Sequence, residues 1–157
     1  IMVADCLPVL LSDTQGRAVA AAHAGWRGLA GHGGRGILDH TVESLRERVS
    51  RDVDLMAWLG PCIGPQAFEV GSEVKAAFEA SDPGCGGLFA PVGTPAAGKW
   101  LANLPALARR RLAALGITRV YGNDGSAGWC TVANASWFFS HRRDRVSGRL
   151  AASIWLD

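Results

Sequence analysis

A cysteine and a histidine in the first quarter of the chain have residue types suited to metal binding or covalent catalysis. Cys6 and His23 stand in two apolar segments separated by the turn residues 12–16, so a hairpin would bring their side chains together. A thiolate and an imidazole are good ligands for zinc or copper. They are also the nucleophile and general base of cysteine catalysis. A catalytic zinc site normally has three protein ligands, and the sequence shows no obvious third.

Each of these two residues also has a purely structural interpretation. A cysteine on an apolar strand is usually a small buried hydrophobe. A histidine at the end of a strand is often only hydrogen-bonded. At this point both interpretations of Cys6 and His23 stay open.

The segment that follows His23 has the composition of a ligand-binding turn. Gly25 and Gly28 allow backbone amides to approach a ligand closely, and Arg27 can hold a phosphate or carboxylate in a bidentate manner. In the structural alternative, Trp26 packs in the core and Arg27 caps a helix or pairs with an acid. The two alternatives have about equal weight.

A second group of polar residues lies near the C-terminus. Arg142, Arg143, Arg145 and Arg149, which follow His141, form a locally basic cluster. They form either an anion-binding rim or a solvated turn after a strand.

The four cysteines, Cys6, Cys62, Cys85 and Cys130, are widely spaced and form no CxxC pair. A structural zinc ribbon is therefore not expected. Cys62 lies in a Gly/Pro-rich loop, where it is either a reactive thiol or part of a structural turn. Because no secretion signal is visible, we expect reduced thiols and a cytoplasmic location.

Length and composition exclude several classes of protein. The chain has 157 residues, 48% of them apolar, and a formal net charge of +2. This composition supports one packed core. The net charge is too small to indicate binding to nucleic acid or to an anionic membrane. No apolar run approaches the roughly 20 residues of a membrane span. The chain opens directly on a core-like strand, so we expect that an N-terminal part is missing.

The apolar periodicity predicts how these residues are positioned. Strands are expected at 1–11, 17–23, 53–59, 117–121, 136–142 and 149–156. Helices are expected at 34–49, after a Ser72 cap, and between an Asn103 cap and Gly116. Residues 83–99 read as a loop. Interleaved strands and helices indicate an α+β fold, a mixed α/β sandwich, in a single domain over residues 1–157.

Four motifs together resemble one protein family. They are Ala-Asp-Cys-Leu-Pro-Val at residues 4–9, His-Ala-Gly-Trp-Arg-Gly at 23–28, Gly-Pro-Cys-Ile-Gly-Pro at 60–65 and Phe-Phe-Ser-His-Arg-Arg-Asp at 138–144. The combination is similar to the YfiH-like laccase-domain family, whose members are also called multicopper polyphenol oxidases or purine nucleoside phosphorylases. The extra glycines near residues 33–34 and an insertion near 125–129 depart from the family pattern.

The resemblance implies a metal, usually zinc and alternatively copper, held by one cysteine and two histidines. It places the cysteine at Cys6 and one histidine at His23, and the other histidine belongs to a segment that would precede Ile1. Cys62 is not a ligand in this pattern. Asp5 would then orient one of the metal-binding side chains without binding the metal itself.

The activity implied by the resemblance is phosphorolysis of purine nucleosides, with adenosine deamination as a further activity on the same small-molecule substrates. Phosphorolysis needs an anion pocket, for which Arg27 with the amides near Gly25 and Gly28 is the first candidate. Arg143 and Arg149 are weaker candidates. Copper-dependent phenol oxidation, hydrolysis of peptidoglycan precursors by Cys6 with His23 as base, and a non-catalytic fragment are the alternatives.

Overall fold

A four-stranded sheet forms the centre of the fold. The structure is a computed structural model that describes residues 1–94 and 97–157. Strands β2 (Leu7–Asp13) and β3 (Val19–Ala24) form an antiparallel hairpin. β4 (Leu55–Leu59) pairs antiparallel with β2, and β8 (Arg119–Gly122) pairs parallel with β4, so the order is β3-β2-β4-β8. The hairpin expected around Cys6 and His23 is therefore present.

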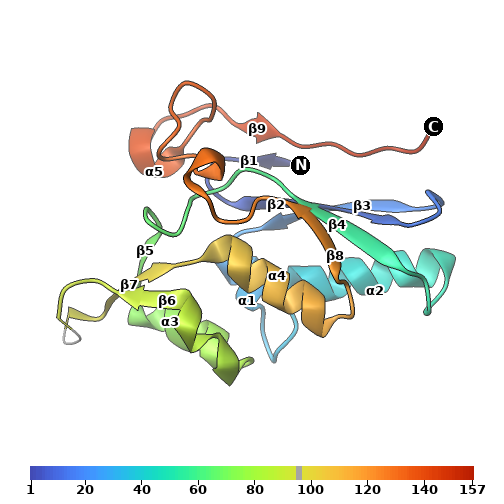
Figure 1. Cartoon of the computed structure of the whole chain (residues 1–157), viewed down its shortest axis with the longest axis horizontal. Coiled ribbons are helices and arrows are strands. Elements are labelled where there is room, and N and C mark those ends of the chain that lie inside the picture. The colour runs from blue at the N-terminus through green and yellow to red at the C-terminus, as the bar shows by residue number, and fades with distance from the viewer. Residues whose placement is uncertain (95–96) are drawn as a thin grey trace.

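Helices cover one side of this sheet, as Figure 1 shows. They are α1 (Trp26–Ala30), α2 (Ile37–Val49) and α4 (Leu104–Ala114). Alternate residues of β2, among them Leu7, Val9 and Leu11, are fully buried, and they join one core with the apolar faces of the helices. Successive side chains of a strand point to opposite faces of the sheet, so every second residue of β2 faces the helices and the core.

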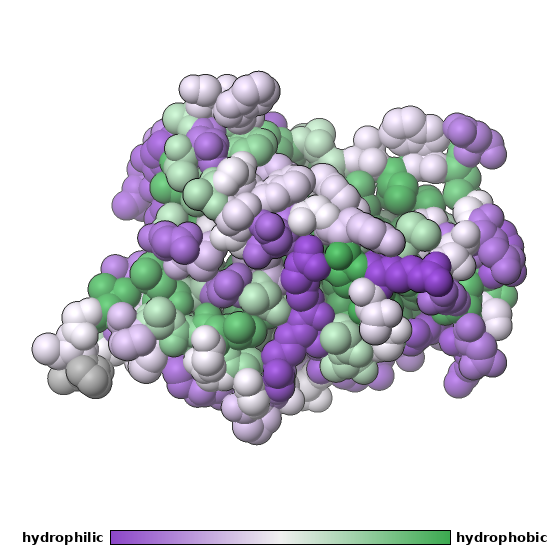
Figure 2. Space-filling view, in the orientation of Figure 1, coloured by the Kyte–Doolittle hydropathy of each residue, from purple (hydrophilic) through white to green (hydrophobic). Residues whose placement is uncertain are grey.

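Helix α4 begins and ends where local signals in the sequence predict. The side chain of Asn103 accepts a hydrogen bond from the amide of Ala106 at 3.1 Å, and Pro105 occupies the first turn. Gly116 follows the helix with φ of +80°, a conformation that favours glycine. The solvent side carries arginines, and Figure 2 shows strongly hydrophilic side chains over this part of the surface.

A smaller three-stranded sheet replaces much of the predicted loop 83–99. Its strands β5 (Glu69–Gly71), β7 (Lys99–Ala102) and β6 (Phe89–Pro91) pair antiparallel in that order. A 3₁₀ helix (Pro83–Leu88) precedes β6. Residues 95–96 of the predicted loop lie outside the described residues. The loop prediction was wrong at residues 89–91 because β6 forms by pairing with β7, a contact that Gly and Pro content does not report.

Helix α3 (Ser72–Glu79) lies beside this sheet, and its start differs from the prediction. The cap position is Gly71 and no side chain caps the helix. Ser72 is the first helical residue, and its hydroxyl donates to the carbonyl of Gly98 at 3.2 Å.

Two predicted C-terminal strands were also wrong or too long. Residues 136–142 form turns that lead into the short helix α5 (His141–Asp144), where the Ser140 hydroxyl accepts from the amide of Arg143. Of 149–156, only β9 (Leu150–Ala151) is a strand, and it pairs antiparallel with β1 (Met2–Val3). Neither the aromatic segment 136–142 nor the alternating segment 149–156 finds a further partner strand among the described residues.

The molecule has the α+β fold expected from the sequence, with α5, β1 and β9 on the side of the sheet away from α1, α2 and α4 (Figure 1). Within the described residues, no helix has the length and apolar character needed to cross a membrane.

Candidate functional site

Cys6 lies against the backbone of Gly25 at the end of the β2–β3 hairpin. The register pairs Leu7 with Ala24 and Pro8 with His23, so Cys6 comes opposite Gly25. A Cβ atom added at position 25 would lie 3.0 Å from the Cys6 sulfur. Glycine at this position therefore keeps open the space beside the thiol.

His23 shares a face of the hairpin with Cys6. Opposed residues in antiparallel strands point to one face, and residues two apart in a strand do so as well. Because His23 is two residues before Gly25, it is a diagonal neighbour of Cys6, at a typical separation of about 7–8 Å. His23 is exposed and Cys6 is partly buried. The register therefore places Cys6 and His23 at the same end of the hairpin, with Cys6 in the wall of a cavity that His23 does not line.

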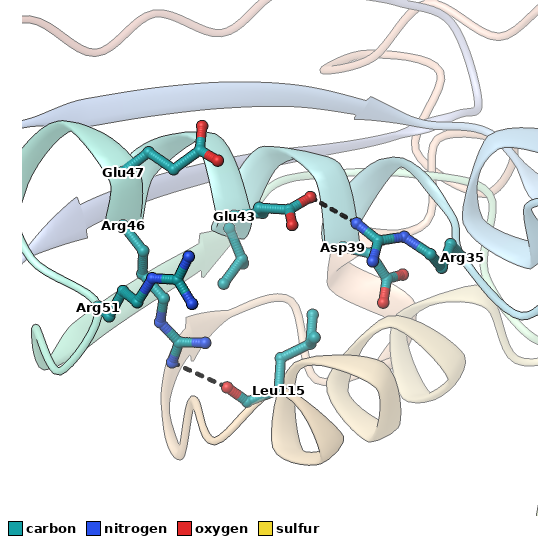
Figure 3. Close-up of a pocket in the computed structure, with 8 residues that line it drawn as sticks. Arg35, Asp39, Glu43, Arg46, Glu47, Arg51 and Leu115 are labelled. Carbon is teal, nitrogen blue, oxygen red and sulfur yellow. Dashed lines mark hydrogen bonds and ion pairs between the residues drawn. The ribbon is translucent and has the colours of Figure 1, made fainter.

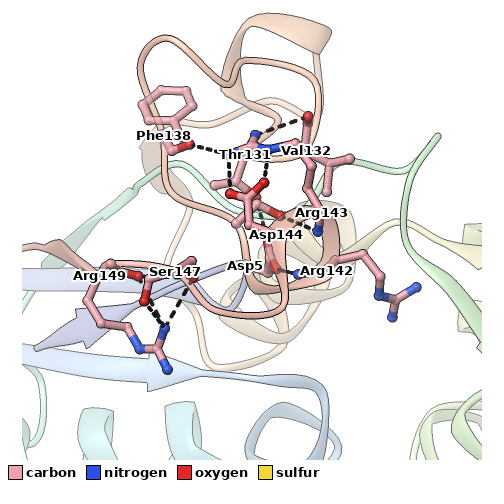
Figure 4. A network of polar contacts seen from close by, with 11 residues as sticks. Asp5, Thr131, Val132, Phe138, Arg142, Arg143, Asp144, Ser147 and Arg149 are labelled. Atoms are coloured by element: carbon pink, nitrogen blue, oxygen red, sulfur yellow. Dashed lines mark hydrogen bonds and ion pairs between the residues drawn. The ribbon is translucent and has the colours of Figure 1, made fainter.

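Asp5 holds the chain just before Cys6 in a left-handed conformation, with φ of +80°. Its buried carboxylate accepts a hydrogen bond from the Thr131 hydroxyl at 2.6 Å and another from the backbone amide of Arg142 at 2.7 Å. Its carbonyl accepts from the amide of Ile63 at 2.9 Å. Figure 4 shows this network around Asp5. The carboxylate thus ties the Cys6 turn to the segments around residues 131 and 142.

The surroundings of Cys6 keep its thiol protonated. Burial is the largest cause that raises the pKa of Cys6, and the negative charge of Asp5 raises this pKa further. The positive charge of Arg149 opposes both effects. A cation bound at the thiol would favour the thiolate.

A cavity of about 190 Å³ opens beside Cys6. One part of its wall is apolar and one part is cationic. The apolar part consists of Ala4, Trp26, Ile63, Phe68 and Leu104, and the polar part consists of Asp5, Cys6, His141, Arg142 and Arg145. The sequence alone singled out Cys6 and the basic cluster, but not Phe68 or Leu104 as part of one site. Phe68 belongs to a segment that shares in the family resemblance, and Leu104 directly follows the Asn103 cap, but neither signal points to a common site.

Arg27 and Gly28 both belong to α1, next to the cavity. The guanidinium of Arg27 lies 4.4 Å from the ring centroid of Trp26, whose side chain lines the cavity, and Arg27 is exposed. A Cβ at Gly28 would meet the His23 carbonyl and Ile37 at 3.7 Å, which is an ordinary contact. The first anion candidate therefore stands beside the cavity wall and does not line the cavity.

The guanidinium of Arg143 is fully engaged by the protein. It donates to the backbone carbonyls of Thr131, Val132 and Phe138 at 2.8, 3.3 and 3.1 Å and forms a bidentate pair with Asp144 (Figure 4). These bonds use all five N–H groups of the side chain. Arg143 therefore braces the turn around α5.

Arg149 stands on the other side of Asp5 from the guanidinium of Arg142, as Figure 4 shows. Its guanidinium donates to the carbonyls of Ser147 and Gly148 at 3.3 and 3.1 Å. It is close enough to Cys6 to lower the pKa of the thiol.

The other cysteines are free thiols that do not line the cavity. Cys62 is fully buried and forms a β-bridge with Cys130. Burial strongly raises the pKa of Cys62, so its thiol is inert at neutral pH. The structural interpretation of the Gly/Pro loop is favoured.

A larger hollow, of about 320 Å³, lies along α2 and is lined largely by charged residues (Figure 3). Its charges are partly paired within the protein. Arg35 forms an ion pair with Glu43 at 2.5 Å, and Arg46 donates to the Leu115 carbonyl at 3.0 Å. It holds neither a cysteine nor a histidine, so the cavity beside Cys6 is the better candidate for a catalytic site.

The donor set at Cys6 and His23 fits part of a metal site. Thiolate and imidazole suit zinc or copper, and Gly25 leaves room beside the sulfur. Across residues 1–94 and 97–157, no group of three or more His, Cys, Asp or Glu side chains is arranged to hold a metal ion. The hairpin therefore offers two donors, and a complete site would take at least one more.

The chain thus combines an α+β fold, a hairpin that carries Cys6 and His23, and a partly cationic cavity beside Cys6. The family described as multi-copper polyphenol oxidoreductase laccase matches residues 1–157, and the chain belongs to this family.

Relatives with solved structures or curated names share this whole chain. A purine nucleoside phosphorylase of Pseudomonas aeruginosa is 48% identical over 157 residues, which are 100% of this chain and 60% of the relative. The purine nucleoside phosphorylase YfiH of Escherichia coli is 46% identical over 99% of this chain and 58% of its own length. A Neisseria meningitidis protein structure superposes with a TM-score of 0.81 at 47% identity, covering 95% of this chain and 56% of that one. The chain thus spans somewhat more than half the length of these relatives.

Proposed function

We propose that this chain carries the nucleoside-binding part of a purine nucleoside phosphorylase that uses a bound metal ion. The observation that carries the proposal is the placement of Cys6 and His23 on one face of a hairpin, with Gly25 leaving room beside the thiol. The names of the relatives at 48% and 46% identity support the same reaction.

In this proposal Cys6 and His23 are the catalytic pair, because they supply two donors to a zinc ion, with copper as the alternative. A bound zinc ion would supply Lewis-acid catalysis. Asp5 positions Cys6 through its bonds to Thr131 and to the amide of Arg142. Gly25 keeps the approach to the sulfur free.

The cavity beside Cys6 suits a nucleoside because it combines aromatic and polar walls. Trp26 and Phe68 offer apolar surface for a purine ring, and the cationic residues lie near the thiol. In phosphorolysis a phosphate oxygen bonds to C1′, the C1′–N9 bond breaks, and the base leaves with its electron pair and takes a proton. The products are the free base and ribose 1-phosphate. Arg27, with the backbone near Gly25 and Gly28, and Arg149 are candidates to attract the phosphate.

The test is phosphate-dependent turnover of inosine and adenosine, together with elemental analysis of the metal, in protein that carries all 157 residues. Cys6→Ser and His23→Ala should each lower metal content and turnover by about tenfold or more. His40→Ala is the matched control, because His40 is also exposed but lies on α2. If metal content and turnover survive in both site variants, the proposed site is refuted. Ammonia release from adenosine without phosphate would identify deamination as a second activity.

Copper-dependent phenol oxidation is the second candidate, because the matched family is named for it. A multicopper centre needs many histidines, whereas this chain has four, all exposed. Stoichiometric copper with strong phenol oxidation and no nucleoside turnover would favour this candidate.

A further inference from the structure

The arginines in and next to the short helix α5 have different surroundings: the side chain of one is fully hydrogen-bonded, and two others line the cavity. Arg143 has all five N–H groups bonded within the protein. Arg142 and Arg145, which flank it, line the cavity together with Cys6 and His141. Neither Arg142 nor Arg145 forms an ion pair with a carboxylate in the described part of the chain.

Arg142 is held firmly at both ends of its length. Its backbone amide donates to Asp5 at 2.7 Å, and its guanidinium donates to the Glu69 carbonyl at 3.1 Å. The guanidinium also lies 5.8 Å from the ring centroid of Phe68, within cation–π range. One N–H group is used by the carbonyl, so four remain for a ligand.

Arg145 follows α5 in a left-handed conformation, with φ of +63°, which is uncommon for arginine. Its amide donates to the His141 carbonyl at 2.9 Å, which closes the turn. Within the described residues its side chain has no hydrogen bond. Backbone strain of this kind often accompanies a functional site, and here it accompanies a cationic side chain at the cavity.

The acidic group in the cavity wall forms no ion pair with either arginine. The Asp5 carboxylate accepts from the Thr131 hydroxyl and from the backbone amide of Arg142, and not from a guanidinium. Two unpaired guanidinium groups at one cavity suit a phosphate dianion, which accepts several charge-assisted hydrogen bonds.

We propose that Arg142 and Arg145 bind the phosphate group at the cavity beside Cys6. This inference rests on the proposed function for its choice of ligand and changes the expected anion residues from Arg27, Arg143 and Arg149 to the pair that flanks Arg143. A phosphate group can come from inorganic phosphate or from the 5′-phosphate of a nucleotide.

The experiment compares Arg142→Gln and Arg145→Gln with the wild-type protein in two ways. Calorimetric titration measures the affinity for inorganic phosphate and, in a separate arm, for inosine 5′-monophosphate. Steady-state kinetics measure KM for phosphate and KM for inosine. Each variant should weaken phosphate binding and raise KM for phosphate about 10- to 100-fold, while KM for inosine changes less than threefold.

Matched variants separate this proposal from a general loss of charge or fold. Arg119→Gln is the control, because Arg119 is exposed on β8 and its one ion pair within the described residues is with the exposed Asp54. Arg145→Asn tests the turn, since asparagine tolerates the left-handed conformation. It should keep the wild-type melting temperature while losing phosphate affinity. Arg27→Gln tests the earlier anion candidate directly.

Each outcome has a defined meaning. The proposed pair is overturned if phosphate affinity is unchanged in both Arg142→Gln and Arg145→Gln. It is also overturned if Arg119→Gln loses as much phosphate affinity as these two variants, or if Arg27→Gln is the only variant that loses phosphate affinity. If the wild-type protein binds phosphate but turns over no nucleoside, the phosphorylase function fails while the pair stands. Loss of nucleotide affinity alone, with inorganic phosphate binding unchanged, overturns the assignment to inorganic phosphate.

Discussion

Gly25 lies directly beside the thiol of Cys6, so close that a Cβ at position 25 would stand 3.0 Å from the sulfur. The backbone at Gly25 has φ of −71°, which any residue adopts. Glycine is therefore required at this position because a larger side chain would crowd the thiol, and not because of the backbone conformation.

We expect Gly25→Ala to reduce metal binding and turnover with little effect on stability. The added methyl group would crowd the sulfur, whereas the extended backbone accepts alanine, so the free energy of unfolding should change by about 1 kcal/mol or less. Metal content, turnover and urea denaturation measure these quantities. Gly87→Ala is the control, since a Cβ there meets nothing within 4 Å. Equal metal content in the two variants would contradict the spatial argument.

Thr131→Val should lower the stability of the protein by removing a hydrogen bond to Asp5, next to Cys6. Thr131 is fully buried and donates to Asp5 at 2.6 Å. Valine keeps the shape but leaves a buried carboxylate oxygen without its donor, at a cost of about 1–3 kcal/mol in unfolding free energy. Urea denaturation measures this cost. The exposed Thr118 provides the control substitution Thr118→Val, which should change stability by less than about 0.5 kcal/mol.

Arg143→Lys should lower stability without changing the affinity for phosphate. Lysine cannot reproduce the fork that bonds Thr131, Val132, Phe138 and Asp144 at once. We expect a lower melting temperature together with phosphate affinity within threefold of wild type. Calorimetry of unfolding and of phosphate binding tests both parts. A large loss of phosphate affinity at an unchanged melting temperature would instead identify Arg143 as a direct ligand.

Stability should fall as the pH drops from about 4 to about 2, in part through Asp13. Burial acts to raise the pKa of Asp13, but the bonds to its carboxylate from the Arg17 side chain and from the amides of Arg17 and Ala18 together outweigh burial and lower the pKa to about 2. A depressed folded-state pKa adds stability above the unfolded-state pKa, and this stability is lost as the pH falls through the folded-state pKa.

Denaturation curves at several pH values test this expectation with Asp13→Asn. The variant should be less stable than wild type at pH 7, and the difference should shrink toward pH 2. Asp52→Asn is the control, because Asp52 is exposed and its carboxylate makes no hydrogen bond among the described residues. A stability difference that stays constant from pH 7 to pH 2 would contradict the titration of Asp13.

The sequence alone was enough to predict the elements that local signals determine. The cap at Asn103, the glycine after α4 and the turn of the β2–β3 hairpin each depend on residues within a few positions. The motifs around Cys6 and His23 were likewise sufficient for the family, which the match over residues 1–157 confirms.

Only the tertiary structure decided which residues share the cavity and which strands exist near the C-terminus. Residues 136–142 carry successive aromatic side chains and were predicted to be a strand, but they find no partner strand among the described residues, and the Ser140 hydroxyl caps α5 at the end of this segment. Arg142, Arg143 and Arg145 look alike in the sequence. Arg142 and Arg145 line the cavity. Bonds to the carbonyls of Thr131, Val132 and Phe138 and to the neighbouring Asp144 instead engage the guanidinium of Arg143. Such bonds depend on how distant segments pack, which local residue patterns do not encode.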